Sequence, residues 1–264
     1  MKPSLICALL ALTLFSRCDS DDDAPSNGSK LHVVTMYLQN QQGAFRPGFT
    51  NTYFYSPGGR LEREEYASYD TEKKEFELLW TVTFSYQDNR VSETKKVFTQ
   101  GGDPDYVRYT YGANGKLSAM DVQEDVHTVA TVTYDASDTT SVFYQHSNGR
   151  SFTYRFFTKN GNITYEQTLN DSHQLSGETT YEFDSHTNPY SQLGYTDVFF
   201  TNFSQNNKTS TVGKYYSDAF PNSVPDTYEY TYNTAGLPTQ QTIHYKSYPN
   251  GNPSGAIHYT FEYY

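Results

Sequence analysis

The fold is decided by a stretch that recurs along the chain, first as YFYSPGGRLEREEY at residues 53–66. Aromatic residues stand two apart, a short turn with glycine follows, and an apolar residue opens an outgoing polar segment. Alternation with a period of two is typical of a β-strand with one buried face, and glycine supplies the positive φ angles of tight turns. The stretch therefore predicts a β-hairpin.

The pattern returns at intervals of about 23 to 31 residues along most of the chain. Further copies are RYTYGANGKLSAMD at 108–121, YRFFTKNGNITYEQ at 154–167 and YTYNTAGLPTQQTI at 230–243. A fixed period of this size indicates a repeat architecture, and consecutive strands usually pair with each other. We expect an all-β fold, an antiparallel meander of repeated hairpins that forms a large curved sheet and can roll into a barrel. A split into two sheets near residue 190 is the alternative.

Composition favours strands over helices. The chain of 264 residues contains 26 tyrosines and 17 phenylalanines, which fit the pleated, half-buried face of a sheet. One charged stretch, RLEREEYASYDTEKKEFELLW at 60–80, resembles a helix, but we interpret it as a hairpin with its turn near Asp70 to Lys74. We therefore expect no significant helix after the signal peptide. The gap from Phe183 to Tyr232 is about two periods and predicts one degenerate unit there.

The repeat resembles the YD repeat of Rhs-type proteins, and more closely the YD/Rhs-like repeats of a Bacteroidetes lipoprotein family. The likeness rests on YEFDSHTNPY at 181–190, the Asn pair at 206–207 and YEYTYNTAGLP at 228–238, and it covers roughly residues 50–264. The resemblance implies the fold and gives almost no information about activity. The aspartate after the second aromatic is present at Asp135 and Asp184 but replaced at other repeats, which argues against an Rhs-like toxin-encapsulating role.

The N-terminus predicts export and a lipid anchor. Lys2 precedes an apolar run from Leu5 to Phe15, which is too short to span a bilayer and suits a signal peptide over residues 1–17. Cys18 follows, in a stretch that resembles a loose lipobox with Ser16 two positions before the cysteine. In lipoproteins such a cysteine becomes the first mature residue and carries acyl chains. Ordinary cleavage after Cys18 is the alternative.

The next segment predicts a tether. Residues 18–30 are acidic and rich in Ser, Gly and Pro, so they cannot bury enough apolar surface to fold. The tether contains four closely spaced aspartates: Asp19, Asp21, Asp22 and Asp23. In Bacteroidetes lipoproteins, which this arrangement resembles, an acidic run after the cysteine is a signal for export to the cell surface. The alternative is that the aspartates only keep the tether solvated. The YD-repeat-like β domain then spans residues 31–264.

Charge and cysteine content exclude several classes. The formal net charge is −11, and −13 without Lys2 and Arg17, so the chain lacks the basic patch that nucleic acids need. It also lacks a polybasic segment for anionic lipid. Cys7 leaves with the signal peptide and Cys18 is acylated, so we expect no disulfide, thiolate metal site or cysteine nucleophile in the mature domain.

Catalytic motifs are missing from the sequence. The seven histidines show no HExxH spacing, and there is no P-loop or G-x-S-x-G elbow, so we expect no catalytic residue, metal or cofactor. We interpret the carboxylates as solvated; they include Glu62, Glu64, Glu65, Asp121, Glu124 and Asp125. Two aromatic rows, Tyr106/Tyr109/Tyr111 and Trp80/Phe84/Tyr86, are interpreted as structural cross-strand pairs, with a glycan-stacking platform as the alternative.

These observations predict a non-enzymatic, lipid-anchored lipoprotein of the cell envelope, held in the outer membrane and facing the cell exterior. Its role is binding or scaffolding, with a glycan or protein as the ligand, membrane contact through the anchor and no nucleic acid. The alternative is a surface polysaccharide-binding or polysaccharide-degrading accessory protein. The ligand-binding residues are not predictable from the sequence.

Overall fold

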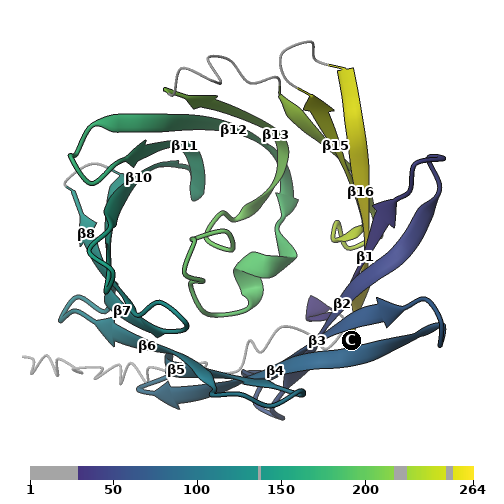
Figure 1. The fold of residues 1–264 in the computed structure, drawn as a ribbon, viewed down its shortest axis with the longest axis horizontal. Coiled ribbons are helices and arrows are strands. Elements are labelled where there is room, and N and C mark those ends of the chain that lie inside the picture. Colours follow the sequence, from purple (N-terminus) through teal and green to yellow (C-terminus); the bar gives the residue numbers. More distant parts are fainter. Residues whose placement is uncertain (1–28, 136–137, 217–224, 248–251) are drawn as a thin grey trace, which may run out of the picture.

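A computed structural model describes residues 29–135, 138–216, 225–247 and 252–264. These residues form one closed barrel in which sixteen antiparallel strands pair in chain order, and the last strand pairs with the first (Figure 1). The strands are β1 (Leu31–Gln39), β2 (Phe45–Tyr55), β3 (Leu61–Asp70), β4 (Glu75–Gln87), β5 (Arg90–Phe98), β6 (Asp105–Tyr111), β7 (Leu117–Gln123), β8 (Thr128–Tyr134), β9 (Thr139–His146), β10 (Ser151–Lys159), β11 (Asn162–Leu169), β12 (Leu175–Thr187), β13 (Asn206–Tyr215), β14 (Asp226–Tyr232), β15 (Pro238–Ser247) and β16 (Asn252–Tyr263).

The all-β meander predicted from the repeats is confirmed. The charged stretch at 60–80 is the hairpin of β3 and β4, with its turn after Asp70 and a positive φ of 60° at Lys74. The two-sheet alternative is wrong, because β12 and β13 pair across residue 190 within the single closed sheet. The 3₁₀ turn η2 (Pro189–Gln192) is four residues long, and no helix among the described residues is long and apolar enough to span a membrane.

The wall of the barrel is apolar inside and polar outside. Along β8, Ala130 and Val132 are buried toward the lumen, whereas Thr131 and Thr133 are exposed on the outer face. Strands β6 and β9 alternate in a similar way. Exposed polar residues on the strands include Thr83, Ser85, Arg108, Thr110, Gln145, Arg155, Thr180, Glu182, Glu229 and Thr231, with single apolar residues such as Val97 and Val129 among them. A barrel that crosses a membrane has the opposite arrangement, with an apolar band on its outer face. The outer face described here therefore has the character of a surface in contact with water.

The sequence repeat produces a repeated contact at one rim of the barrel. A basic residue from each turn lies over the ring of the second aromatic of the next unit: Lys30 over Tyr55 at 5.4 Å, Arg60 over Tyr86 at 5.5 Å, Arg90 over Tyr111 at 5.3 Å and Lys116 over Tyr134 at 4.6 Å. Such cation–π contacts contribute about 0.5–1 kcal/mol each. These contacts join four successive units along the N-terminal half of the barrel, so the repeat helps to set the pairing of neighbouring strands there.

The residue after each of these basic residues is apolar and buried: Leu31, Leu61, Val91 and Leu117. Two of these residues also accept a hydrogen bond at the backbone. The Tyr86 hydroxyl donates to the Leu61 carbonyl over 2.7 Å, and the Tyr111 hydroxyl donates to the Val91 carbonyl over 2.9 Å. In these two units tyrosine as the second aromatic serves twice, because its ring receives the cation and its hydroxyl reaches the neighbouring strand.

The chain between β12 and β13 turns into the barrel. Residues 188–205, here called the luminal segment, begin with η2 and lie inside the ring of strands (Figure 1, green). Leu193 and Phe200 of this segment are buried in the same core as the inward side chains of the wall. The region predicted to hold one degenerate unit therefore contains the luminal segment followed by β13.

We expect truncation of an inward valine to destabilise the barrel far more than truncation of an outward valine of the same strand. Val132 is 5% exposed and Val129 is 40% exposed, and both lie on β8. Val132→Ala should lower the free energy of unfolding by about 2 kcal/mol through lost burial and a residual cavity. Val129→Ala should change it by less than about 0.5 kcal/mol. Urea unfolding of both variants measures this, and equal losses would contradict the assigned faces.

Candidate ligand site in the barrel lumen

Asn188 links the beginning of the luminal segment to its end by hydrogen bonds. Its amide donates to the Ser204 carbonyl over 2.9 Å, and its oxygen accepts from the backbone N–H of Tyr190 over 3.1 Å. The Asn188 backbone N–H also donates to the Gln205 carbonyl over 2.8 Å. A buried backbone must find partners for its polar groups, and a buried asparagine supplies both a donor and an acceptor. This explains why the segment begins at an asparagine.

The luminal segment contacts the wall on several sides. The Tyr195 ring lies 5.0 Å from Phe84 of β4, Phe200 stacks on Phe156 of β10 at 5.1 Å, and Tyr190 meets Phe261 of β16 at 6.1 Å. On β9, the Tyr144 hydroxyl donates to the Val198 carbonyl. On β11, the Ile163 backbone N–H donates to Ser204 Oγ over 3.1 Å. Contacts with five strands hold the segment in place across the lumen.

A cavity of about 400 Å³, the luminal cavity, remains between the segment and the wall. This volume falls in the range of small-molecule sites. Its aromatic lining includes Tyr53, Tyr190, Tyr195, Tyr228, Tyr230, Tyr259 and Phe261. Its amide lining consists of Asn51, Asn188, Asn202, Asn206, Asn207 and Gln241, and its charged lining of Glu64, Asp197 and Lys208. Apolar walls with a few polar groups are the usual composition of a ligand pocket.

Glu64 is the distinctive group of the luminal cavity. It lies on β3 directly opposite Tyr53 of β2, and among the described residues its carboxylate makes neither a hydrogen bond nor an ion pair. Burial raises the pKa of Glu64 to about 7, because the charged form loses its hydration. On the same side of the cavity, the buried Asn51 Oδ1 also has no hydrogen-bond partner in the described part of the chain. The Glu64 carboxylate is therefore the acceptor that lines the cavity without a donor, and Asn51 Oδ1 is a second unpaired acceptor buried in the wall beside it.

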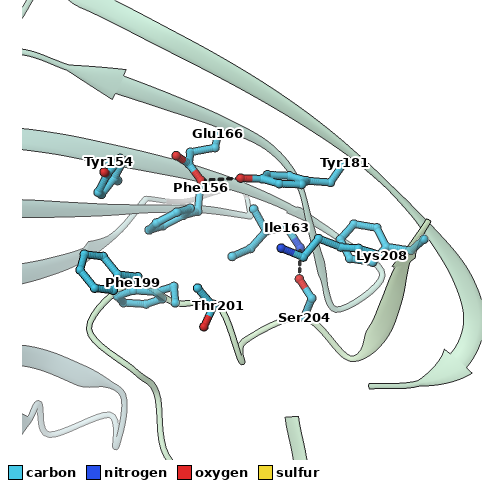
Figure 2. Close-up of a pocket in the computed structure, with 11 residues that line it drawn as sticks. Tyr154, Phe156, Ile163, Glu166, Tyr181, Phe199, Thr201, Ser204 and Lys208 are labelled. Atoms are coloured by element: carbon cyan, nitrogen blue, oxygen red, sulfur yellow. Dashed lines mark hydrogen bonds between the residues drawn. The ribbon is translucent and has the colours of Figure 1, made fainter. Parts of the chain in front are cut away.

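A smaller cavity of about 190 Å³, the side cavity, lies between the segment and strands β10 to β13 (Figure 2). The Tyr181 hydroxyl donates to Glu166 Oε2 over 2.8 Å, and Lys208 Nζ lies 5.1 Å from the centre of the Tyr181 ring. Burial lowers the pKa of Lys208, against the opposing effect of the carboxylates of Glu166 and Asp197. Burial likewise raises the pKa of both carboxyls. Lys208 lines both cavities, so these three groups form one charge cluster between them.

The predicted anchor and export residues, Cys18, Asp19, Asp21, Asp22 and Asp23, lie outside the described residues. Of the two aromatic rows, Phe84 and Tyr109 are buried toward the lumen. The described chain contains no group of three or more His, Cys, Asp or Glu side chains that could hold a metal ion.

The interpretation of the carboxylates as solvated is wrong for Glu64. This residue stands in a charged run between Arg63 and Glu65, which hides its position in the sequence. The alternation of the strand could have located it, because Glu64 shares a face with the aromatic Tyr66 two residues later. Asp197 and Lys208 had no comparable signal, since nothing in the local pattern shows that the connection after β12 enters the lumen.

No family model matches this chain, and no curated protein is significantly similar to it in sequence. Among solved structures, it is similar to a porin-like protein from Bacteroides uniformis, with 12% identity, a TM-score of 0.47, and coverage of 91% of this chain and 100% of the other. A protein of unknown function from Bacteroides fragilis shows 17% identity, a TM-score of 0.19, and coverage of 51% and 82%. The TcdB2–TccC3–Cdc42 structure shows 12% identity, a TM-score of 0.23, and coverage of 84% and 14%.

We expect the ionisation of Glu64 to lower stability as pH rises. The folded chain keeps this proton up to a pH of about 7, whereas an ordinary glutamate loses it near 4.5, so the free energy of unfolding falls across that window and the loss is complete above it. The free energy of unfolding of Glu64→Gln, compared with that of wild type at the same pH, should therefore rise by up to about 3 kcal/mol from pH 4.5 to pH 8. Urea unfolding at both pH values measures this. Glu65→Gln is the matched control, and a Glu64→Gln effect independent of pH would contradict the assignment.

Proposed function

We propose that this protein is a non-enzymatic, lipid-anchored binding protein of the bacterial cell envelope, and that the barrel lumen holds its ligand. The observation that carries the proposal is the luminal cavity, where tyrosine side chains line the space around the desolvated Glu64 carboxylate, which has no donor among the described residues. A desolvated acceptor without a donor costs about 1–3 kcal/mol. A ligand that brings donors would recover this free energy on binding, whereas an empty scaffold gains nothing from such a site.

The polar outer face supports attachment through an anchor. Exposed threonines and charged residues on the wall suit water, and a lipid-facing barrel would need an apolar band there. The acyl chains proposed for Cys18 would hold the barrel at the outer membrane by the tether of residues 18–30. The aspartates of that tether would then direct the domain to the cell exterior. Several acyl chains give stable attachment where a single chain does not.

Binding of a polysaccharide end is the second candidate. Amide side chains and tyrosine rings both line the luminal cavity, and these residue types suit a ligand with both apolar faces and hydroxyl groups. An accessory role in degradation would call on Glu64 and Asp197, since most glycoside hydrolases act through two carboxylates. This candidate places the sugar in the lumen, because the aromatic residues Phe84 and Tyr109 face inward and are buried.

The anchor and its sorting signal have separate tests in a bacterial host. Wild type should take up labelled palmitate and Cys18→Ser should not, because the thiol is the acylation site. Replacing all four aspartates with asparagine should keep the label but protect the domain from protease added to intact cells. Equal labelling of wild type and Cys18→Ser would contradict lipidation. Equal protease sensitivity of wild type and the asparagine variant would reduce the aspartates to a solvated linker.

Luminal binding can be followed on the unaltered chain by methyl NMR. A panel of monosaccharides, amino acids and small amines should contain a compound that shifts the methyl resonances of Ile243 and Leu193, which line the luminal cavity. The outward Val97 and Val129, which are 42% and 40% exposed, serve as internal controls and should stay unmoved. Shifts confined to the outward valines would place binding on the outer wall and contradict the proposal.

A further inference from the structure

The charges that line the two cavities are unequally compensated. Lys208 is influenced by the carboxylates of Glu166 and Asp197, which share the space between the cavities with it. Glu166 also accepts a hydrogen bond from the Tyr181 hydroxyl. Asp197 accepts a hydrogen bond of 2.6 Å from the backbone N–H of Thr201. Glu64 makes neither a hydrogen bond nor an ion pair in the described residues, so its carboxylate lines the cavity without a positive partner.

Aromatic rings surround this carboxylate. Tyr53 lies directly across from it on β2, and Tyr53 and Glu64 both line the luminal cavity. Burial raises the pKa of Tyr195, and the charge of Glu64 is the second cause. Burial also raises the pKa of Tyr190, followed by Tyr259 and then Glu64, so both hydroxyls lie near Glu64. Rings from the wall and from the luminal segment therefore enclose one side of the cavity, and a cation over the face of such rings is attracted by their π electrons.

We propose that the cavity beside Glu64 binds a small organic ammonium ion, with its N–H donors on the Glu64 carboxylate and the tyrosine rings around the cation. This inference rests on the proposed luminal binding function and names its ligand class. A neutral sugar could donate to the same carboxylate but would leave the buried charge of Glu64 uncompensated. An ammonium ion supplies both the donors and the missing positive charge.

Benzylammonium chloride is a suitable probe, because it joins one ammonium group to one ring and is small compared with a cavity of about 400 Å³. Calorimetry on the full mature chain at pH 8 should show binding that weakens at least about tenfold in Glu64→Gln. Glu65→Gln is the matched control, since Glu65 lies on the outer face beside Arg63, and it should bind as wild type does. Benzyl alcohol, the neutral analogue, should bind at least about tenfold more weakly than benzylammonium.

The pH dependence gives an independent readout. Wild type should bind benzylammonium more weakly at pH 5.5 than at pH 8, because Glu64 is then largely protonated and carries no charge. The groups facing Glu64 from β2 and the luminal segment are Tyr53, Tyr190 and Tyr195, and Asp197 and Lys208 complete the charged lining. Loss of the pH dependence in Glu64→Gln would separate the effect of Glu64 from any titration of Asp197 or Lys208.

Three results would overturn the inference: no benzylammonium binding at millimolar concentration, equal binding by wild type and Glu64→Gln, or equal affinity for benzyl alcohol. The methyl shifts of Ile243 and Leu193 then distinguish the two proposals. If a neutral sugar moves those resonances while benzylammonium does not bind, the cation inference fails and luminal binding stands. If no compound of the panel moves them, both proposals fail.

Discussion

The width of a sixteen-stranded barrel is the constraint on which the rest of this structure depends. Eight strands enclose a space that side chains alone can fill, whereas sixteen leave a lumen too wide for them. With a polar outer face and an apolar inner face, this chain must exclude water from much of that lumen to stay folded. It does so with its own backbone, by sending residues 188–205 inward between β12 and β13.

The polar backbone groups of a segment inside an apolar lumen need hydrogen-bond partners, and asparagine side chains supply several of them. Asn188 and Asn202 bond backbone groups of the luminal segment, and Asn162 and Asn206 pair with each other where the segment rejoins the wall. The distance between the wall and the luminal segment also explains why the lumen is rich in aromatic residues. Large rings from the wall, such as Phe84 and Phe156, reach rings of the segment that smaller side chains would not touch. The filling is incomplete, and the charged groups of the lumen lie in the spaces that remain.

The hairpin repeat was sufficient to predict the strands, their antiparallel order and the turn between β3 and β4, because alternation and turn residues are local properties. The closure of the barrel was harder to predict, because it depends on the pairing of Leu31 with Tyr263, and no local sequence pattern links these two residues. The candidate site escaped prediction for two reasons. Glu64 is surrounded in sequence by charged residues that do face outward, and the inward course of residues 188–205 follows from the size of the finished barrel rather than from its own sequence.

The pairing of β1 with β16 has a consequence for how the chain folds. These strands are the first and the last of the barrel, so two open edges persist until every other strand has formed, and contacts this distant in sequence are slow to make. Exposed strand edges invite pairing with other chains while they wait. The pairing of β1 with β16 therefore removes both remaining open edges of the sheet at once.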